Sequence, residues 1–163
     1  TGMGLVVIEA AKRAQAGEGG AAIQKAMEEL TPRVEASFVI DRLDYLYKGG
    51  RCSALAALGA NLLHLKPCIE VRNGKMGVGR KYRGAYEKVL RQYAYDRLHA
   101  REDIDRERAF ITWSTCPQPA LDAVRAVCRE EGHFDELLET QAGCTICNHC
   151  GPNTLGVLFV RKG

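Results

Sequence analysis

Apolar residues recur at helical spacing at the start of the chain. Leu5, Ile8 and Ala11 share one face of a helix, and the glycine-rich segment 17–20 ends the pattern. Residues 21–34 repeat the same spacing with a second apolar face. The sequence therefore predicts two helices packed as a hairpin.

The period of the pattern changes after this hairpin. Residues 37–40 form a short run rich in β-branched and aromatic side chains, and such a run is typical of a strand. Asp41 is the predicted N-cap of a short helix over 42–47, because its carboxylate can accept hydrogen bonds from the free amides of the first turn. The Ala- and Leu-rich segment 53–65 carries little charge, which indicates a helix buried on most sides.

Asn73 and Gly74 mark the clearest turn of the chain. This pair readily takes the positive φ angles of a two-residue turn, so residues 68–71 and 75–78 are predicted to form a β-hairpin. The remaining predicted elements, in chain order, are a helix over 83–100 with a charged, solvated end at 101–108, a strand over 110–113, a helix over 119–128, a strand over 134–140 and a closing strand over 154–161.

These elements together predict the fold class. Strands separated by helices alternate with one hairpin, and the sequence shows no internal repeat or low-complexity linker. We expect a single α/β domain over residues 1–163, with a mixed β-sheet packed by helices.

Composition narrows the class of protein without identifying it. The 163 residues are 46% apolar and 26% charged, as in an ordinary globular domain, and the net charge of +3 is too small for a broadly basic nucleic-acid-binding surface. Seven cysteines in mostly apolar surroundings favour reduced thiols and a cytoplasmic location. No apolar run approaches the ~18 residues of a transmembrane segment, and the start at Thr1 without methionine suggests part of a longer protein.

The densest cluster of potential ligands runs from Cys144 to Asn153. Two cysteine pairs spaced three apart and His149 suggest zinc, but all ligands crowd into seven residues, and the adjacent His149 and Cys150 are poorly placed to converge on one ion. On the residues alone we expect no metal, and His149 is most simply a turn residue beside buried thiols.

A second cluster is Gly49-Gly50-Arg51. Paired glycines beside a guanidinium can bind an anion, although most such sequences are helix ends. The spacing and the Gly-Lys-Ser/Thr ending of a phosphate loop are absent. Nucleotide hydrolysis is therefore not indicated.

A basic stretch with interleaved tyrosines runs from Arg72 to Arg91. Its members are Arg72, Lys75, Arg80, Lys81, Arg83, Lys88 and Arg91, with Tyr82, Tyr86 and Tyr93 among them. The alternatives are a solvated helix face, a docking face for an acidic protein, and a nucleic-acid-binding or regulatory surface that stacks bases on the tyrosines.

Residues that would indicate catalysis are scarce. The sequence contains no Ser/His/Asp elbow, no glycine-framed pair of carboxylates and no cofactor fingerprint. Cys116 and the adjacent His149 and Cys150 are the nucleophile-like candidates, and neighbouring side chains usually point apart. We expect no catalytic residues and no cofactor.

Four motifs, in this order, resemble the DegV family of bacterial fatty-acid-binding proteins. They are residues 3–11 (MGLVVIEAA), 38–51 (FVIDRLDYLYKGGR), 58–67 (LGANLLHLKP) and 149–160 (HCGPNTLGVLFV). The resemblance implies that the chain is a DegV C-terminal domain from which the N-terminal DegV domain is absent. It also implies a non-catalytic carrier that binds a long-chain fatty acid between the two domains and presents its carboxylate to a separate fatty acid kinase subunit.

The resemblance assigns roles to particular residues. His149 matches the contact of the family's C-terminal domain to the carboxylate, and Cys150, Gly151 and Asn153 belong to the same ligand-binding loop. Arg51 and Arg83 match basic positions near the mouth of the site, where they would dock the kinase subunit or stabilise the acyl phosphate.

Two residues of the loop depart from the family pattern. Asn153 stands where many members have glycine, and Cys150 where Thr or Ser is common.

The apolar helices over 5–16 and 53–65 are predicted to line the site of the acyl tail. Burial of a long tail at ~0.8 kcal/mol per methylene would drive binding.

Overall fold

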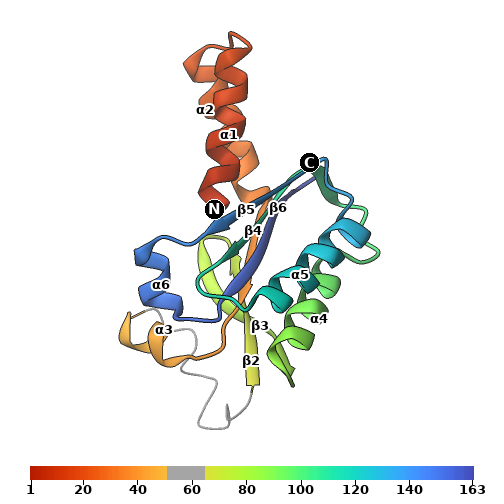
Figure 1. Cartoon of the computed structure of the whole chain (residues 1–163). Helices are drawn as coiled ribbons and strands as arrows, with labels where there is room; N and C mark the ends of the chain where they lie inside the picture. The colour runs from red at the N-terminus through yellow and green to blue at the C-terminus, as the bar shows by residue number, and fades with distance from the viewer. Residues whose placement is uncertain (51–64) are drawn as a thin grey trace.

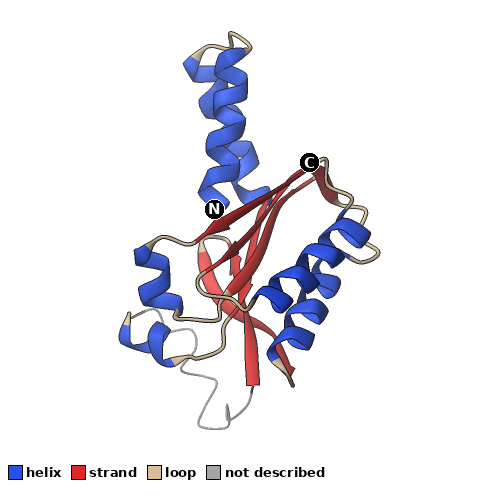
Figure 2. Cartoon of the chain, viewed as in Figure 1, coloured by secondary structure: helices blue, strands red, loops and turns tan. Residues whose placement is uncertain are grey.

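One six-stranded sheet carries helices on both faces in the computed structural model, which describes residues 1–50 and 65–163 (Figures 1 and 2). The strand order is β3-β2-β1-β6-β4-β5, and among the described strands only β4 and β5 pair in parallel. The strands are β1 (Val34–Val39), β2 (Leu65–Arg72), β3 (Lys75–Arg83), β4 (Ile104–Trp113), β5 (Glu136–Gln141) and β6 (Leu155–Arg161). The predicted α/β fold with a mixed sheet is confirmed.

The helical hairpin at the start of the chain is also confirmed. It consists of α1 (Gly2–Gln15) and α2 (Gly20–Leu30), and it projects beyond the end of the sheet (Figure 1). The predicted end of the second helix at residue 34 is wrong. Pro32 lies in a 3-10 turn that follows α2, and Val34 already belongs to β1.

The predicted β-hairpin joins β2 to β3. Asn73 and Gly74 have φ angles of 52° and 72°, which the two-residue turn requires and which these residue types tolerate. The following helix α4 (Tyr86–Leu98) begins later than predicted, because Arg83 is still part of β3. Pro67 lies within β2 beside an irregularity of the pairing.

Asp41 does not cap a helix, so that prediction is wrong. The short helix α3 (Asp44–Lys48) begins after Leu43 and has no side-chain cap. The predicted helix over 53–65 lies outside the described residues, apart from Leu65, which begins β2.

The charged segment 101–108 is not a solvated helix end, because β4 begins within it at Ile104. Its arginines turn inward instead: Arg106 donates to the carbonyl oxygens of Glu131 and Gly132. The predicted helix and strands that follow are present as α5 (Gln118–Val127), β5 and β6, and a π-type turn, Cys128–Gly132, extends α5. The helix α6 (Cys144–Cys150) was not predicted.

Successive side chains of a strand point to opposite faces of the sheet, so the buried residues form separate clusters on the two faces. Ile111 and Phe159 face α4 and α5, whereas their neighbours Phe110 and Leu158 face the base of the hairpin. Tyr93 of α4 is fully buried in the first cluster, and its hydroxyl oxygen lies 2.8 Å from the carbonyl oxygen of Ser37. Each fully buried large apolar side chain contributes about 1.5–3 kcal/mol. No helix in the described part of the chain is long and apolar enough to cross a membrane.

Candidate functional site

The segment from Cys144 to Asn153 forms a short helix and a tight return to the sheet. Gly143 precedes α6 with extended backbone, and Gly151 ends the helix at a φ of 76°, which favours glycine. The Gly151 amide donates to the Cys147 carbonyl at 2.8 Å, and Pro152 cannot continue the helix. His149 is therefore held in the last turn of a helix rather than in an open turn.

Two glycines allow α6 and α3 to lie side by side (Figure 1). A Cβ atom on Gly49 would collide with Nδ1 of His149, and one on Gly151 would lie 2.5 Å from the Tyr45 ring. The two helices thus contact each other through one glycine each. The structure brings the two glycine motifs of the sequence, Gly49-Gly50 and the loop after His149, to the same place.

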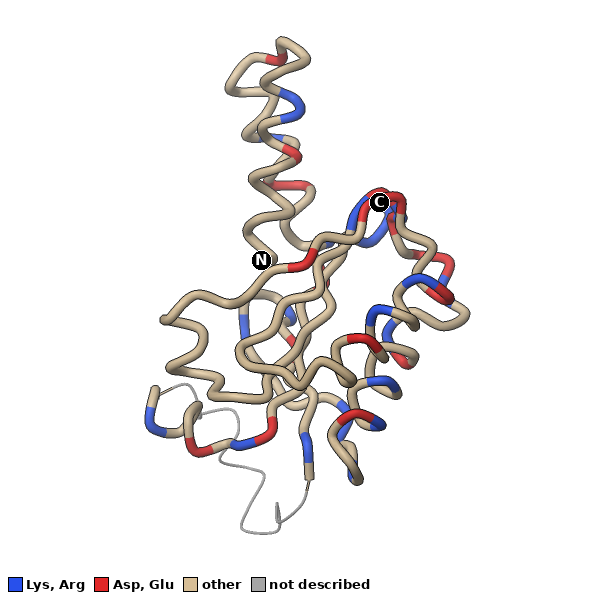
Figure 3. The backbone as a smooth tube through the Cα atoms, viewed as in Figure 1, with Lys and Arg blue, Asp and Glu red and all other residues tan. Residues whose placement is uncertain are grey.

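The imidazole of His149 is half-buried at this contact. Its Nδ1 is fully buried, and neither ring nitrogen hydrogen-bonds to residues 1–50 or 65–163. Buried polar atoms normally have a partner, so an unpartnered nitrogen here is a candidate contact for a ligand. The chain around His149 is electrically neutral, because residues 140–160 contain no Lys, Arg, Asp or Glu (Figure 3).

The loop after α6 is fastened to the end of β4 by Ser114. The Ser114 hydroxyl donates to the Gly151 carbonyl at 2.7 Å and accepts from the Thr154 amide at 3.2 Å. The backbone amide of Asn153 donates to the Thr115 carbonyl at 2.9 Å. Ser114 is buried and fixes the position of the loop, although no sequence pattern indicated such a role.

Asp41 connects the loop to β2. Its carboxylate forms an ion pair with Lys66 and accepts from the Asn153 side-chain amide at 3.2 Å. Burial opposes ionisation of Asp41, but the hydrogen bonds from Lys66 and Asn153 outweigh it and lower the pKa of the carboxyl group. Asn153 has a φ of 55° and thus supports the loop with both its backbone and its side chain.

An apolar cluster lies directly beside this loop. Ile40, Leu46, Ile69 and Cys150 are buried in it, and four partly buried residues pack against them: Phe38, Leu43, Met76 and Val78. Burial raises the pKa of the Cys150 thiol to about 11, so Cys150 serves as a small apolar residue here. Tyr47 and Ile146 of the two helices are exposed at the same end of the sheet. A nitrogen donor is thus placed next to a partly covered apolar surface.

Of the two helices predicted to line the acyl tail, the first lies away from this loop and the second lies largely outside the described residues. Leu5 of α1 packs on Phe110 and Leu158, in a separate cluster at the base of the hairpin. The segment 53–65 lies outside the described residues except for Leu65, and Arg51 is not among the described residues either. Arg83 is exposed at the end of β3, opposite Leu65, and forms no ion pair with the part of the chain that the structure describes.

Two of the three tyrosines of the basic stretch are not available for stacking bases. Tyr82 and Tyr93 are buried in the core between the sheet and α4, where their rings meet edge to face. Arg80 forms an ion pair with Asp96, and Arg72 pairs with Glu70. Base stacking on Tyr82 and Tyr93 is therefore excluded, because these two rings hold α4 to the sheet, whereas Tyr86 is half-buried.

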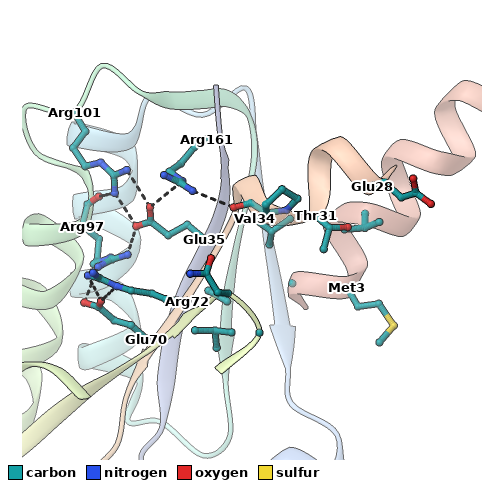
Figure 4. Close-up of a pocket in the computed structure, with 17 residues that line it drawn as sticks. Met3, Glu28, Thr31, Val34, Glu35, Glu70, Arg72, Arg97, Arg101 and Arg161 are labelled. Atoms are coloured by element: carbon teal, nitrogen blue, oxygen red, sulfur yellow. Dashed lines mark hydrogen bonds and ion pairs between the residues drawn. The ribbon is translucent and has the colours of Figure 1, made fainter. Parts of the chain in front are cut away.

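A hollow of about 1150 Å³ lies at the opposite end of β1 between the hairpin and the sheet (Figure 4). Arginine side chains converge there on Glu35: Arg101 donates to it at 2.7 and 3.0 Å, and Arg97 forms an ion pair with it. Arg97 also pairs with Glu70 at 3.1 Å. These charges are paired with one another, although Arg97 Nε is buried without a hydrogen-bond partner among the described residues, so the size of the hollow alone does not make it the better candidate site. Among the residues described, no three His, Cys, Asp or Glu side chains come together to hold a metal ion.

Comparison with known proteins adds independent information. The family model described as an uncharacterised protein of the DegV family matches residues 1–162. A DegV domain-containing protein of Caldanaerobacter subterraneus subsp. tengcongensis is 32% identical over 161 residues, which are 99% of this chain and 57% of that relative.

Solved structures share the fold. A fatty-acid-binding DegV family protein from Thermus thermophilus matches with a TM-score of 0.80 and 28% identity, over 98% of this chain and 57% of its own. The Streptococcus pneumoniae Fatty Acid Kinase (Fak) B3 protein loaded with linoleic acid has a TM-score of 0.79 at 17% identity, over 96% and 54% of the two chains, and shows a shared fold alone. The chain spans slightly more than half the length of these proteins.

Proposed function

Because the chain belongs to the DegV family, we propose that it binds the carboxylate of a long-chain fatty acid where α3 and α6 meet. The observation that carries this proposal is His149. Its ring nitrogens have no partner among the described residues although one of them is buried. A neutral or protonated imidazole donates a hydrogen bond to a carboxylate, which would supply the missing partner.

The loop around His149 suits this role. Gly49 and Gly151 lack the side chains that would block the imidazole or the α3 contact, and Asn153 with Asp41 holds the loop in place. The neutral surroundings of the imidazole leave a bound carboxylate without competing acidic groups on the same segment.

The acyl tail would lie on the apolar cluster beside the loop. Phe38, Leu43, Met76 and Val78 are only partly buried, so a hydrocarbon chain on them would remove further apolar surface from water. At about 0.8 kcal/mol per buried methylene, six methylenes supply roughly 5 kcal/mol. The Thermus thermophilus relative, which binds a fatty acid, supports an apolar chain as the ligand.

In this proposal the chain is a carrier and not a catalyst. An N-terminal DegV domain would complete the site, and a fatty acid kinase subunit would phosphorylate the presented carboxylate. The Fak B3 protein, which shares the fold, supports such a partner. Arg83, exposed and without an ion pair among the described residues, is proposed to dock the kinase subunit together with Arg51.

Titration of the chain with a fluorescent long-chain fatty acid tests the carboxylate site. His149→Ala should weaken binding about tenfold or more, which corresponds to about 1.4 kcal/mol. Asn148→Ala changes an exposed neighbour on the same helix and should leave the affinity unchanged. Equal affinities of the two variants would remove His149 from the site.

Two further measurements test the ligand class and the proposed role of Arg83 in docking the kinase subunit. Added salt should change acid binding little, whereas nucleic-acid binding through the basic stretch would weaken steeply as counterions are released. Arg83→Glu should slow acyl phosphate formation by a fatty acid kinase subunit without changing the affinity for the acid. A loss of affinity instead would place Arg83 in the ligand site.

A further inference from the structure

Two cysteines of α6 have no role in the site described so far. Cys144 is the first residue of the helix and is exposed, and Cys147 follows one turn later and is half-buried. Residues three apart lie on the same side of a helix, with Cβ atoms about 5–6 Å from each other. We propose that Cys144 and Cys147 form a reversible disulfide, which makes α6 a site of thiol oxidation.

The geometry around the pair favours closure. The Cys147 thiol donates to the Ala142 carbonyl at 3.3 Å, so its sulfur already points back toward the start of the helix, where Cys144 lies. A disulfide needs Cβ atoms about 3.5–4.5 Å apart, so the first turn must tighten by about 1–2 Å. Gly143 before it is exposed, and no described atom lies within 4 Å of the position its Cβ would take. The start of α6 therefore has room to move.

The chemistry is a thiol–disulfide exchange with a small-molecule disulfide as the oxidant. The thiolate of the exposed Cys144 attacks one sulfur of the oxidant, and a mixed disulfide forms as the first small thiol leaves. The Cys147 thiolate then attacks the Cys144 sulfur, and the second small thiol leaves. The two cysteines lose two electrons and two protons, and the oxidant is reduced to two thiols.

The other described cysteines are poor competitors for this reaction. Cys68, Cys128 and Cys150 are buried, and desolvation raises the pKa of their thiols to about 12, 12 and 11. Such groups hold almost no thiolate at neutral pH, and the thiolate is the reactive form. Cys116 is half-buried, and burial raises the pKa of its thiol as well.

Closure of the disulfide would also reach the proposed carboxylate site. The Cys147 carbonyl accepts the Gly151 amide that ends the helix, and His149 lies between these two residues. Movement of Cys147 therefore shifts the turn that positions the imidazole against Gly49. This consequence rests on the proposed function, whereas the disulfide itself does not.

The experiment equilibrates the chain in buffers of reduced and oxidised glutathione, alkylates the remaining thiols and locates unalkylated cysteines by mass spectrometry. Cys144 and Cys147 should lose their alkylation together, and reduction should restore it. Cys144→Ser and Cys147→Ser should abolish the paired loss, while the matched changes Cys116→Ser and Cys150→Ser should preserve it. No paired loss at any glutathione ratio, or a bond that includes Cys150, would overturn the proposal.

Fatty-acid affinity of the reduced and oxidised chain tests the coupling separately. A change of about threefold or more, absent from Cys144→Ser, is expected. A disulfide that forms without any change in affinity overturns the coupling to His149. An oxidised pair in a chain that binds no acid in either state counts against the proposed function and not against the disulfide.

Discussion

The two ends of β1 use polar residues in opposite ways. Near the start of the strand, Glu35 accepts from Arg101 and Arg97, and the Arg161 side chain lies 3.9 Å away. Just past its end, Asp41 forms an ion pair with Lys66, and the imidazole of His149 has no partner among the described residues. We call these the arginine end and the histidine end.

The difference shows which end can accept a ligand at low cost. A carboxylate entering the arginine end would compete with Glu35 and Glu70, which already form ion pairs with the guanidinium groups there. A carboxylate at the histidine end displaces no protein acid from the imidazole. Paired charges hold the fold together at one end, and the proposed ligand site lies at the other, where a ring nitrogen without a partner among the described residues lies beside an apolar surface.

Removal of the central carboxylate should have the largest effect on stability. Glu35→Gln leaves Arg97 and Arg101 facing an uncharged amide, and the side chains of Glu35 and Arg97 are only 15% and 16% exposed. Breaking such a pair costs about 3 kcal/mol, at the low end of the usual range because Arg97 keeps Glu70. Chemical denaturation measures the loss.

A partner at the surface provides the control for Glu35. Asp103 also pairs with Arg101, at 2.6 Å, but its side chain is 52% exposed. Asp103→Asn should therefore cost less than ~1 kcal/mol. Both variants should keep their fatty-acid affinity under conditions where they are folded, and equal losses of stability would contradict the view of Glu35 as the buried centre of the network.

Gly49→Ala should have the next largest effect, and it should act on binding. The new methyl group would collide with Nδ1 of His149, so the ring must leave its place. Overpacking of this kind costs about 1–3 kcal/mol of stability. We expect fatty-acid affinity to fall about tenfold or more, as measured by fluorescence titration.

A change at the adjacent Gly50 distinguishes a steric clash from backbone strain. Gly50 has a φ of 68°, but its Cβ would meet no described atom within 4 Å. Gly50→Ala should cost about 1–2 kcal/mol through the left-handed backbone alone and leave the imidazole in place. If both variants lose affinity equally, the close approach of Gly49 to His149 is not what matters.

Local elements could be predicted from sequence because they depend on neighbouring residues. The Asn73-Gly74 turn has the expected positive φ angles, and the helical hairpin follows from apolar spacing. Asp41 was misplaced because its partners, Lys66 and Asn153, are distant in sequence and outcompeted the nearby amides.

The candidate site could be predicted only in part, for the same reason. The spacing of the residues alone predicted a turn at His149. The resemblance to the DegV family is what assigned His149 the role of a carboxylate contact. The contact of Gly49 with His149 joins positions 100 residues apart, and α6 is too short for its periodicity to show. Nothing local to Ser114 indicates that its hydroxyl fastens the loop.

Asp41→Asn tests the ion pair between Asp41 and Lys66 at the histidine end. Loss of the charge should cost about 1–2 kcal/mol at neutral pH, because Lys66 loses its anionic partner. The folded-state pKa of Asp41 is lower than its ordinary value of 3.8, so its contribution is present at higher pH and disappears as the pH falls through the folded-state pKa. Wild-type and variant stabilities should therefore converge at acidic pH in denaturation measurements. A difference that persists unchanged there would point to a cause other than the charge of Asp41.

The smallest expected effect concerns the change of Asn153 to glycine. Its φ of 55° lies in the left-handed region, which glycine and asparagine tolerate best. Asn153→Gly keeps the backbone conformation and loses the 3.2 Å hydrogen bond to Asp41, at a cost of about 0.5–1.5 kcal/mol. Asn153→Ala adds about 1–2 kcal/mol of backbone strain, so stability should fall in the order Asn, Gly, Ala. We expect both variants to bind the acid nearly as well as wild type, because the amide serves Asp41. A loss of affinity in Asn153→Gly as large as in His149→Ala would instead make Asn153 a direct contact of the carboxylate.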